Sequence, residues 1–225
     1  MHKQGETTAE KTVGNYMRQM GIKAQWVKPY TVTTIDSDFS AKLKNILDEK
    51  FNPDEPDAVW VSDITYIWTF EGFVYLTSIM DLFSRKIIAW VLSTTLEAVH
   101  VVECVEKAKQ RRNIKKPLIF HCDRGCQYVS DVFKEATSGM INSYSKKGYP
   151  WDNACIESFH ALLKREWINR FKIFNYHHAY KLVFEYIETF YNTVRIHSHC
   201  GYLSPDQYEQ EYQQKLCGLA EKLAS

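Results

Sequence analysis

The sequence contains no long hydrophobic run. No stretch of about eighteen apolar residues, the length needed to cross a bilayer, occurs anywhere in the 225 residues. The first residues, MHKQGETTAEK, also lack the apolar segment that a secretory signal requires. We therefore expect a cytoplasmic protein that has no membrane partner.

The sequence also lacks a CxxC pair. Its six cysteines are scattered along the chain, which is typical of reduced thiols. The one group that suggests a zinc site is His121, Cys122 and Cys126, but a closed zinc site needs a fourth ligand from elsewhere. We favour a compact loop there over a zinc site.

A strong excess of charge of one sign is absent as well. The formal net charge is +1, which by itself gives no argument for binding nucleic acid. The charges are unevenly placed, however, because acidic residues dominate 36–71 and basic residues recur in 107–116 and 146–172. Solvated helix faces explain these basic stretches as well as a nucleic-acid surface does.

The pattern of apolar residues predicts the order of helices and strands. Residues 7–20 read as a helix with Thr8 as a candidate cap and Gly21 at its end, and the proline-rich turn at 52–57 starts a new unit. Three strands rich in β-branched and aromatic residues follow at 59–70, 73–83 and 86–93, with tight turns between them at Glu71-Gly72 and Ser84-Arg85. The remaining chain predicts helices at 96–112, 130–137, 153–170 and 177–195, and strands at 118–122 and 141–145. This order predicts an α/β protein with a mixed sheet flanked by helices.

Three acidic residues stand at positions where a site could form. Asp63 lies inside an otherwise apolar strand, where an unpaired carboxylate would be costly, and Asp123 ends the strand LIFHC. Glu157 lies on a helix whose start Asp152 or Asn153 could cap, and it shares one face with His160 and Lys164. Each acid taken alone is better explained as a solvated strand end or helix face.

Five longer phrases carry a resemblance to a known family. They are WVSDITYI, EGFVYLTSIMDLFSRKIIAW, HCDRGCQYVSDVF, SYSKKGYPWDNACIESFHALLKRE and YNTVRIHSHCGYLSPDQYE, in this order. Together they resemble the catalytic part of bacterial insertion-sequence transposases encoded by two overlapping reading frames. These enzymes are relatives of retroviral integrases in the DDE superfamily. The resemblance implies a ribonuclease-H-like fold with a short N-terminal helical segment. It divides the chain into a remnant of a helical, helix-turn-helix-like region with linker (1–50), an integrase catalytic core (51–212) and a C-terminal tail (213–225).

The resemblance also implies which residues act. The family's three metal-binding catalytic acids fall on Asp63, Asp123 and Glu157, whereas Asp81 is expected to be structural. Carboxylates suit Mg²⁺ or Mn²⁺, and the family chemistry implies two such ions that serve DNA cleavage and strand transfer. The residues expected to contact DNA are Lys146, Lys147, His160 and Lys164.

The expected partners are DNA, further copies of the same chain assembled on it, and a separate subunit supplying the helix-turn-helix. Two alternatives stay open at this point. One is an inactive transposase remnant that binds DNA or transposase subunits as a regulator, and the other is a ribonuclease-H-like nuclease. Thirty-three residues separate Asp123 from Glu157, about two fewer than the family usually has, and this shortening bears on the choice.

Overall fold

The computed structural model describes residues 9–22, 43–146 and 149–224. The chain divides into two compact units, Met1–Ile35 and Asp36–Ser225. In the first unit, α1 (Glu10–Gln19) confirms the predicted N-terminal helix. Its N-cap position is taken by Ala9, whose side chain makes no capping bond, and Thr8 lies outside the described residues. Gly21, at φ +70°, follows the helix end as expected.

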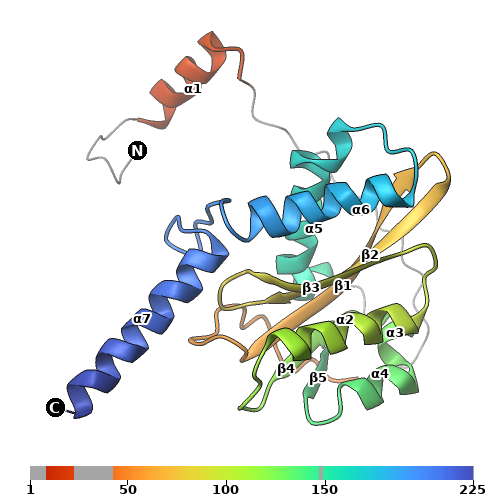
Figure 1. The fold of residues 1–225 in the computed structure, drawn as a ribbon, viewed down its shortest axis with the longest axis vertical. Coiled ribbons are helices and arrows are strands. Elements are labelled where there is room, and N and C mark those ends of the chain that lie inside the picture. Colours follow the sequence, from red (N-terminus) through yellow and green to blue (C-terminus); the bar gives the residue numbers. More distant parts are fainter. Residues whose placement is uncertain (1–8, 23–42, 147–148, 225) are drawn as a thin grey trace. The chain divides into compact units, whose positions relative to one another are not determined.

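The second unit is built on a five-stranded sheet (Figure 1). Its strands lie in the order β3-β2-β1-β4-β5, in which β1, β2 and β3 are antiparallel neighbours and β4 and β5 run parallel to β1. The predicted mixed sheet is therefore confirmed. The strands are β1 (Val59–Thr69), β2 (Gly72–Asp81), β3 (Ile87–Ser93), β4 (Ile119–Cys122) and β5 (Ile141–Tyr144).

The turn between β1 and β2 sets the register of the longest hairpin. Gly72 has φ +119°, a conformation that residues with a side chain rarely adopt, and Thr69 donates a hydrogen bond of 2.8 Å to its carbonyl oxygen. From this turn the strands pair without interruption, so that Asp63 lies opposite Ser78. The two loop residues are Phe70 and Glu71, one position before the predicted Glu71-Gly72 turn, and this position of the turn fixes which residues face each other across the sheet.

Helices cover both faces of the sheet. Trp60 and Ile79 pack with one group of helices, and Val61 and Met80, their neighbours in sequence, pack with the other, as the strand period of two requires. The first group is α2 (Ala98–Arg111), α3 (Cys126–Val129) and α4 (Asp131–Ala136). The second is α5 (Ala154–Glu166), α6 (Tyr176–Phe184) and the π-helix η4 (Glu185–Tyr191).

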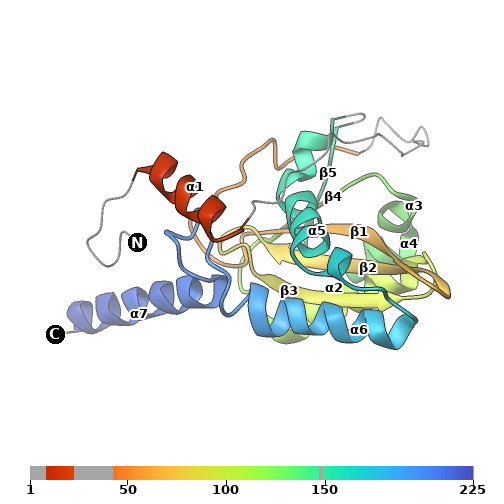
Figure 2. The same cartoon turned by 90° about the horizontal axis from the view of Figure 1, so that it is seen from above.

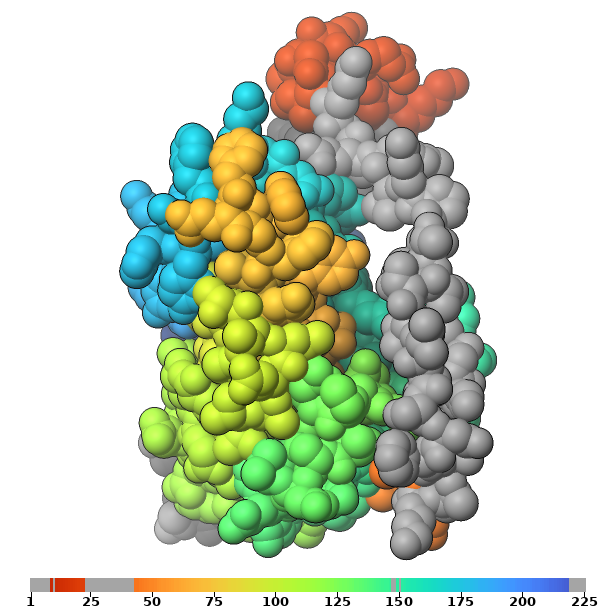
Figure 3. All heavy atoms as spheres, turned by 90° about the vertical axis from the view of Figure 1, so that its right-hand side faces the viewer, coloured from red at the N-terminus to blue at the C-terminus, as the bar shows by residue number. Residues whose placement is uncertain are grey.

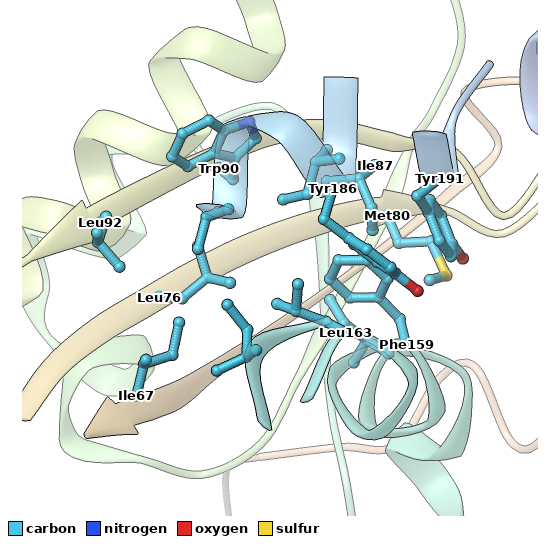
Figure 4. Close-up of a cluster of buried hydrophobic side chains, with 14 of the residues drawn as sticks. Ile67, Leu76, Met80, Ile87, Trp90, Leu92, Phe159, Leu163, Tyr186 and Tyr191 are labelled. Atoms are coloured by element: carbon cyan, nitrogen blue, oxygen red, sulfur yellow. The ribbon is translucent and has the colours of Figure 1, made fainter. Parts of the chain in front are cut away.

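The core between the sheet and α5 positions the helix that carries Glu157. Phe159 and Leu163 of α5 are buried beside Met80 of β2 and Tyr186 of η4 (Figure 4). Ile156 of α5 belongs to the same core, and these three side chains of the helix are at most 1% exposed. Their burial stabilises the helix against the sheet by about 1.5–3 kcal/mol per large side chain.

The remaining elements are shorter or lie at the end of the chain. The predicted helix at 153–170 begins with the 3₁₀ turn η2 (Pro150–Asn153) and ends with a second one, η3 (Ile168–Arg170). The last helix, α7 (Pro205–Ala224), extends away from the sheet in both views (Figures 1 and 2). None of the helices in the described ranges is both long and apolar enough to span a membrane.

Candidate active site

Asp63 lies where β1 loses one of its two neighbouring strands. The pairing of β4 with β1 ends at Ser62 and Cys122, and β1 continues to Thr69 with β2 alone on its other side. The side chain of Asp63 is 20% exposed and points to the face covered by α5. A partly buried carboxylate at an open sheet edge is accessible to a ligand while it stays fixed by the strand.

His160 holds this carboxylate. Its Nδ1 lies 3.3 Å from Asp63 Oδ2, and its Nε2 is 3.3 Å from Ser78 Oγ, the residue opposite Asp63 on β2. The histidine is only 5% exposed. His160, which was expected to contact DNA, is thus turned by α5 toward the sheet. Ser78 was missed in the sequence, because a turn at Glu71-Gly72 would have placed Met80 opposite Asp63.

Asp123 follows the last residue of β4 and is held by the chain that comes after it. The N–H of Gly125 donates a hydrogen bond of 2.9 Å to Asp123 Oδ1. A Cβ atom at position 125 would lie 3.0 Å from the same oxygen and 3.1 Å from Gln127 Oε1. Glycine at this position therefore permits a close approach that any other residue would disturb.

Glu157 is placed by the start of α5. The predicted capping by Asp152 or Asn153 is wrong, since Asn153 is the N-cap residue but makes no side-chain cap bond. Instead Asn153 Nδ2 donates to the carbonyl oxygen of Ser62 at 3.2 Å, and the Lys146 N–H donates to Asp152 Oδ2 at 2.6 Å. The bond to Ser62 ties the helix that carries Glu157 to the residue just before Asp63.

The three carboxylates lie close enough to influence one another electrostatically. Partial burial, followed by repulsion from Asp63 and Asp123, raises the pKa of Glu157 to about 7. The pKa of Lys164 is lowered by burial, and attraction to Asp63 works against this shift. The structure thus brings Asp63, Asp123, Glu157 and Lys164 into one neighbourhood formed by β1, the end of β4, and α5.

The side chains as placed do not form a ready-made metal cage. Within the described ranges, no group of three or more His, Cys, Asp or Glu side chains is arranged to hold an ion. Asp63 and Asp123 are each held by a neighbour, whereas the Glu157 side chain is exposed. Closing the three carboxylates around an ion would require rotation of side chains, chiefly that of Glu157.

The other residues singled out in the sequence lie elsewhere or have other partners. Lys146 Nζ is 3.0 Å from Asp48 Oδ1 on the exposed surface, and Lys147 lies outside the described residues. His121 is fully buried, with Nδ1 2.9 Å from Ser143 Oγ and Nε2 3.2 Å from Ser145 Oγ.

Asp81 has the surroundings of a structural residue. It is fully buried and accepts hydrogen bonds of 2.9 Å from the N–H groups of Asp57 and Phe83. Burial raises its pKa to about 7. These contacts join the ends of the first two strands, where a structural aspartate was expected.

Comparison with known proteins places this site in a family. Models of the integrase core domain match residues 53–164 and 138–205. The chain is 37% identical over 212 residues to the transposase for insertion sequence element IS904 of Lactococcus lactis, covering 93% of this chain and 84% of that protein. The chain belongs to the insertion-sequence transposases with an integrase core. It is also 35% identical over 210 residues to the transposase InsF for insertion sequence IS3A of Escherichia coli, covering 92% of this chain and 73% of that protein.

Solved structures confirm the ribonuclease-H-like fold of this transposase. The catalytic core domain of BIV integrase superposes with a TM-score of 0.53 at 16% identity, covering 71% of this chain and 97% of that chain. The HTLV-2 integrase catalytic core domain in complex with magnesium superposes with a TM-score of 0.51, also at 16% identity, covering 68% and 97%. At this level of identity the likeness extends to the fold alone.

Proposed function

We propose that this transposase cleaves and joins DNA strands at a divalent-metal site formed by Asp63, Asp123 and Glu157. The observation that carries the proposal is the placement of these carboxylates on β1, directly after β4 and on α5, beside the sheet edge that β4 leaves open after Ser62. Concentrated negative charge at an accessible edge is costly unless a cation offsets it.

The donor set fits the expected metal. Carboxylate oxygens are hard ligands that suit Mg²⁺ or Mn²⁺, and no soft ligand stands among the three acids. Two ions at this site would activate the attacking oxygen and stabilise the leaving oxygen during in-line displacement at phosphorus. The HTLV-2 integrase core was solved with magnesium, which supports the same choice for this chain.

Different side chains would orient the metal-binding carboxylates and position the DNA. His160 and Ser78 fix the orientation of Asp63, the Gly125 N–H fixes Asp123, and rotation of Glu157 completes the site. Lys164 supplies a positive charge beside the carboxylates and would position a phosphate of the bound DNA. We assign His160 to the support of Asp63 rather than to the DNA.

Two displacements at phosphorus account for cutting and joining. In the first, a water oxygen bonds to phosphorus, the bond from phosphorus to the 3′-oxygen breaks, and the released 3′-oxygen takes up a proton. In the second, this 3′-hydroxyl attacks a phosphodiester of the target DNA, whose own 3′-oxygen leaves. Because joining brings two DNA ends to one target, we propose that at least two copies of the chain act together in the bacterial cytoplasm.

The decisive experiment compares Glu157→Gln with wild type in strand transfer of labelled DNA ends with Mg²⁺. We expect the substitution to reduce both cutting and joining by more than about 100-fold, the upper effect of residues that only support a metal ligand. Glu135→Gln, an exposed glutamate on α4, is the matched control and should leave both steps unchanged.

Each other outcome has a distinct meaning. Equal activity of Glu157→Gln and wild type would contradict the assignment of the three acids. Cutting by the wild type without joining would instead indicate a nuclease, and DNA binding without either reaction would indicate a regulator. The experiment therefore separates the transposase from both alternatives.

A further inference from the structure

An aromatic surface occupies one face of the β1–β2 hairpin beyond the acidic site. Two cross-strand pairs, Tyr66 with Tyr75 and Trp68 with Phe73, place four rings on the same face of the hairpin. On the opposite face, Ile67 and Val74 are buried in the core, as the alternation of a strand requires. In Figure 3 the atoms of the hairpin (orange to yellow) form part of the visible surface.

About half or more of the surface of three of these rings is open to solvent. Tyr66 is 53% exposed, Trp68 is 60% exposed and Phe73 is 47% exposed. The rings contact one another edge to face, with centroids 5.3 Å apart for Tyr66 and Phe73 and 4.8 Å apart for Trp68 and Phe73. Cross-strand aromatic pairs stabilise a hairpin, but that role does not require so much of each ring to remain open to solvent.

Lys164 connects this surface to the acidic site. Its Nζ lies 4.5 Å from the centre of the Tyr66 ring, and the same ammonium group is attracted by Asp63. This contact is possible because β4 no longer pairs with β1 after Ser62, which leaves that edge of β1 uncovered by a strand. A cation therefore links the carboxylate of Asp63, on the face of β1 covered by α5, to a set of open rings on the opposite face.

We propose that the hairpin face of Tyr66, Trp68 and Phe73 binds unpaired bases next to the reacting phosphodiester. Paired bases are stacked inside the duplex, so only unpaired bases offer flat faces to these rings, while Lys164 offers its charge to a phosphate. The surface would hold a frayed DNA end while the carboxylates act on it. This inference rests on the proposed function, which supplies the DNA end.

The test measures binding without catalysis. In the presence of EDTA, fluorescence anisotropy compares a blunt duplex with the same duplex carrying an unpaired tail of about three nucleotides, enough to cover the rings. We expect wild type to bind the tailed duplex about ten-fold more tightly, a ratio equal to about 1.4 kcal/mol. Trp68→Leu and Phe73→Leu should lose most of this preference, although both keep an apolar side chain.

A matched control is available on another surface. Phe184 on α6 is 45% exposed, close to the value for Phe73, so Phe184→Leu should retain the full preference for the tailed duplex. Thermal unfolding of each variant verifies that the hairpin substitutions leave the fold intact. Trp68→Phe, which keeps a ring, should restore most of the preference that Trp68→Leu loses.

Three outcomes would overturn the inference. The first is that Trp68→Leu and Phe73→Leu keep the wild-type preference for the tailed duplex. The second is that these variants lose affinity for blunt and tailed duplexes equally. The third is that their oligomeric state changes while their DNA preference does not. The last would mean that a second copy of the chain covers the rings. The binding measurement in EDTA needs neither metal nor strand transfer. A failure of the proposed function would therefore appear in strand transfer, and a failure of this inference in the binding ratio.

Discussion

At the scale of single residues, the acids of the site are held in different ways. The carboxylate of Asp63 is fixed by His160, and that of Asp123 by the Gly125 N–H at 2.9 Å. Glu157 stands exposed on its helix, and partial burial of its carboxyl group, followed by repulsion from the other two acids, raises its pKa to about 7. Two carboxylates of the proposed site are therefore held in place, and binding of metal or DNA would bring in the third.

A single methyl group can test how closely Asp123 is positioned. Gly125→Ala would place a Cβ 3.0 Å from Asp123 Oδ1, while the backbone at this position, with φ −56°, accepts alanine without strain. We expect strand cleavage to fall by about ten-fold, because catalysis is sensitive to displacements of about 1 Å. Steady-state cleavage with Mg²⁺ measures the loss, and urea unfolding should show a change in stability of less than about 1 kcal/mol. Full activity of the variant would mean that the Asp123 carboxylate is free to adjust.

At the scale of secondary-structure elements, hydrogen bonds of polar side chains tie two helices to the rest of the fold. The start of α5 is tied to β1 by the hydrogen bond from Asn153 to the Ser62 carbonyl oxygen. The first turns of α7 are tied to the sheet by Glu209, which accepts from Arg112 at 2.6 Å and from Ser84 Oγ at 2.7 Å. Such partly buried contacts fix an element against its neighbours more firmly than exposed ion pairs do.

The contacts of Glu209 give a prediction for the docking of α7. In Glu209→Gln the nearest of the three carboxylates around Arg112 loses its charge, while Asp57 and Asp81 remain 3.7 Å and 3.9 Å away, and the 88% buried Glu209 side chain keeps its shape. We expect the free energy of unfolding to fall by about 1–3 kcal/mol, as for a buried charge that loses its partner. Glu211→Gln, an exposed glutamate two residues further along the same helix, should change it by less than about 0.5 kcal/mol. Urea denaturation measures both values, and equal stability of the two variants would contradict a docking role for Glu209.

At the scale of the whole molecule, ionisable groups with opposite shifts control how stability depends on pH. Burial lowers the pKa of His121 to about 4, and burial together with Arg195 and Arg85 lowers that of His197 to about 4, from an ordinary 6.5. As the pH falls from 6.5 to 4, the unfolded chain binds these protons first, so stability is lost. The raised pKa values of Asp81 and Glu157, both about 7, act in the opposite direction over the same window.

Replacing His197 should show how much this histidine contributes to the pH dependence of stability. His197→Gln eliminates one group that destabilises the fold on acidification, so the variant should gain stability relative to wild type as the pH falls from 6.5 to 4. Urea unfolding of both proteins across this pH range, in EDTA, gives the difference between their free energies of unfolding. The slope of this difference against pH should correspond to a difference that approaches one bound proton per molecule. Parallel stability curves would show that the folded and unfolded states titrate His197 alike.

The sequence alone determined the strands, the family and the helices that cover the sheet, but not α7, the longest helix of the described residues. The Glu71-Gly72 turn and the apolar alternation predicted the hairpin, and Asp63 was recognised within it because the flanking phrases are long and specific. Local signals of this kind depend on residues that are near in sequence, so they can be read without the fold. The pairing register was not predicted, because the turn lies one position earlier than expected.

Only the tertiary structure decided which partners the polar side chains take. His160 turned out to be buried against Asp63, and Asn153 to bond β1 instead of capping its own helix. It also decided that Lys164 lies between the carboxylates and the rings of the hairpin. A polar side chain forms the bonds that its burial leaves available, and burial depends on elements that are distant in sequence. The identities of the three acids therefore follow from the sequence, while their environment follows from the way α5 packs across the sheet.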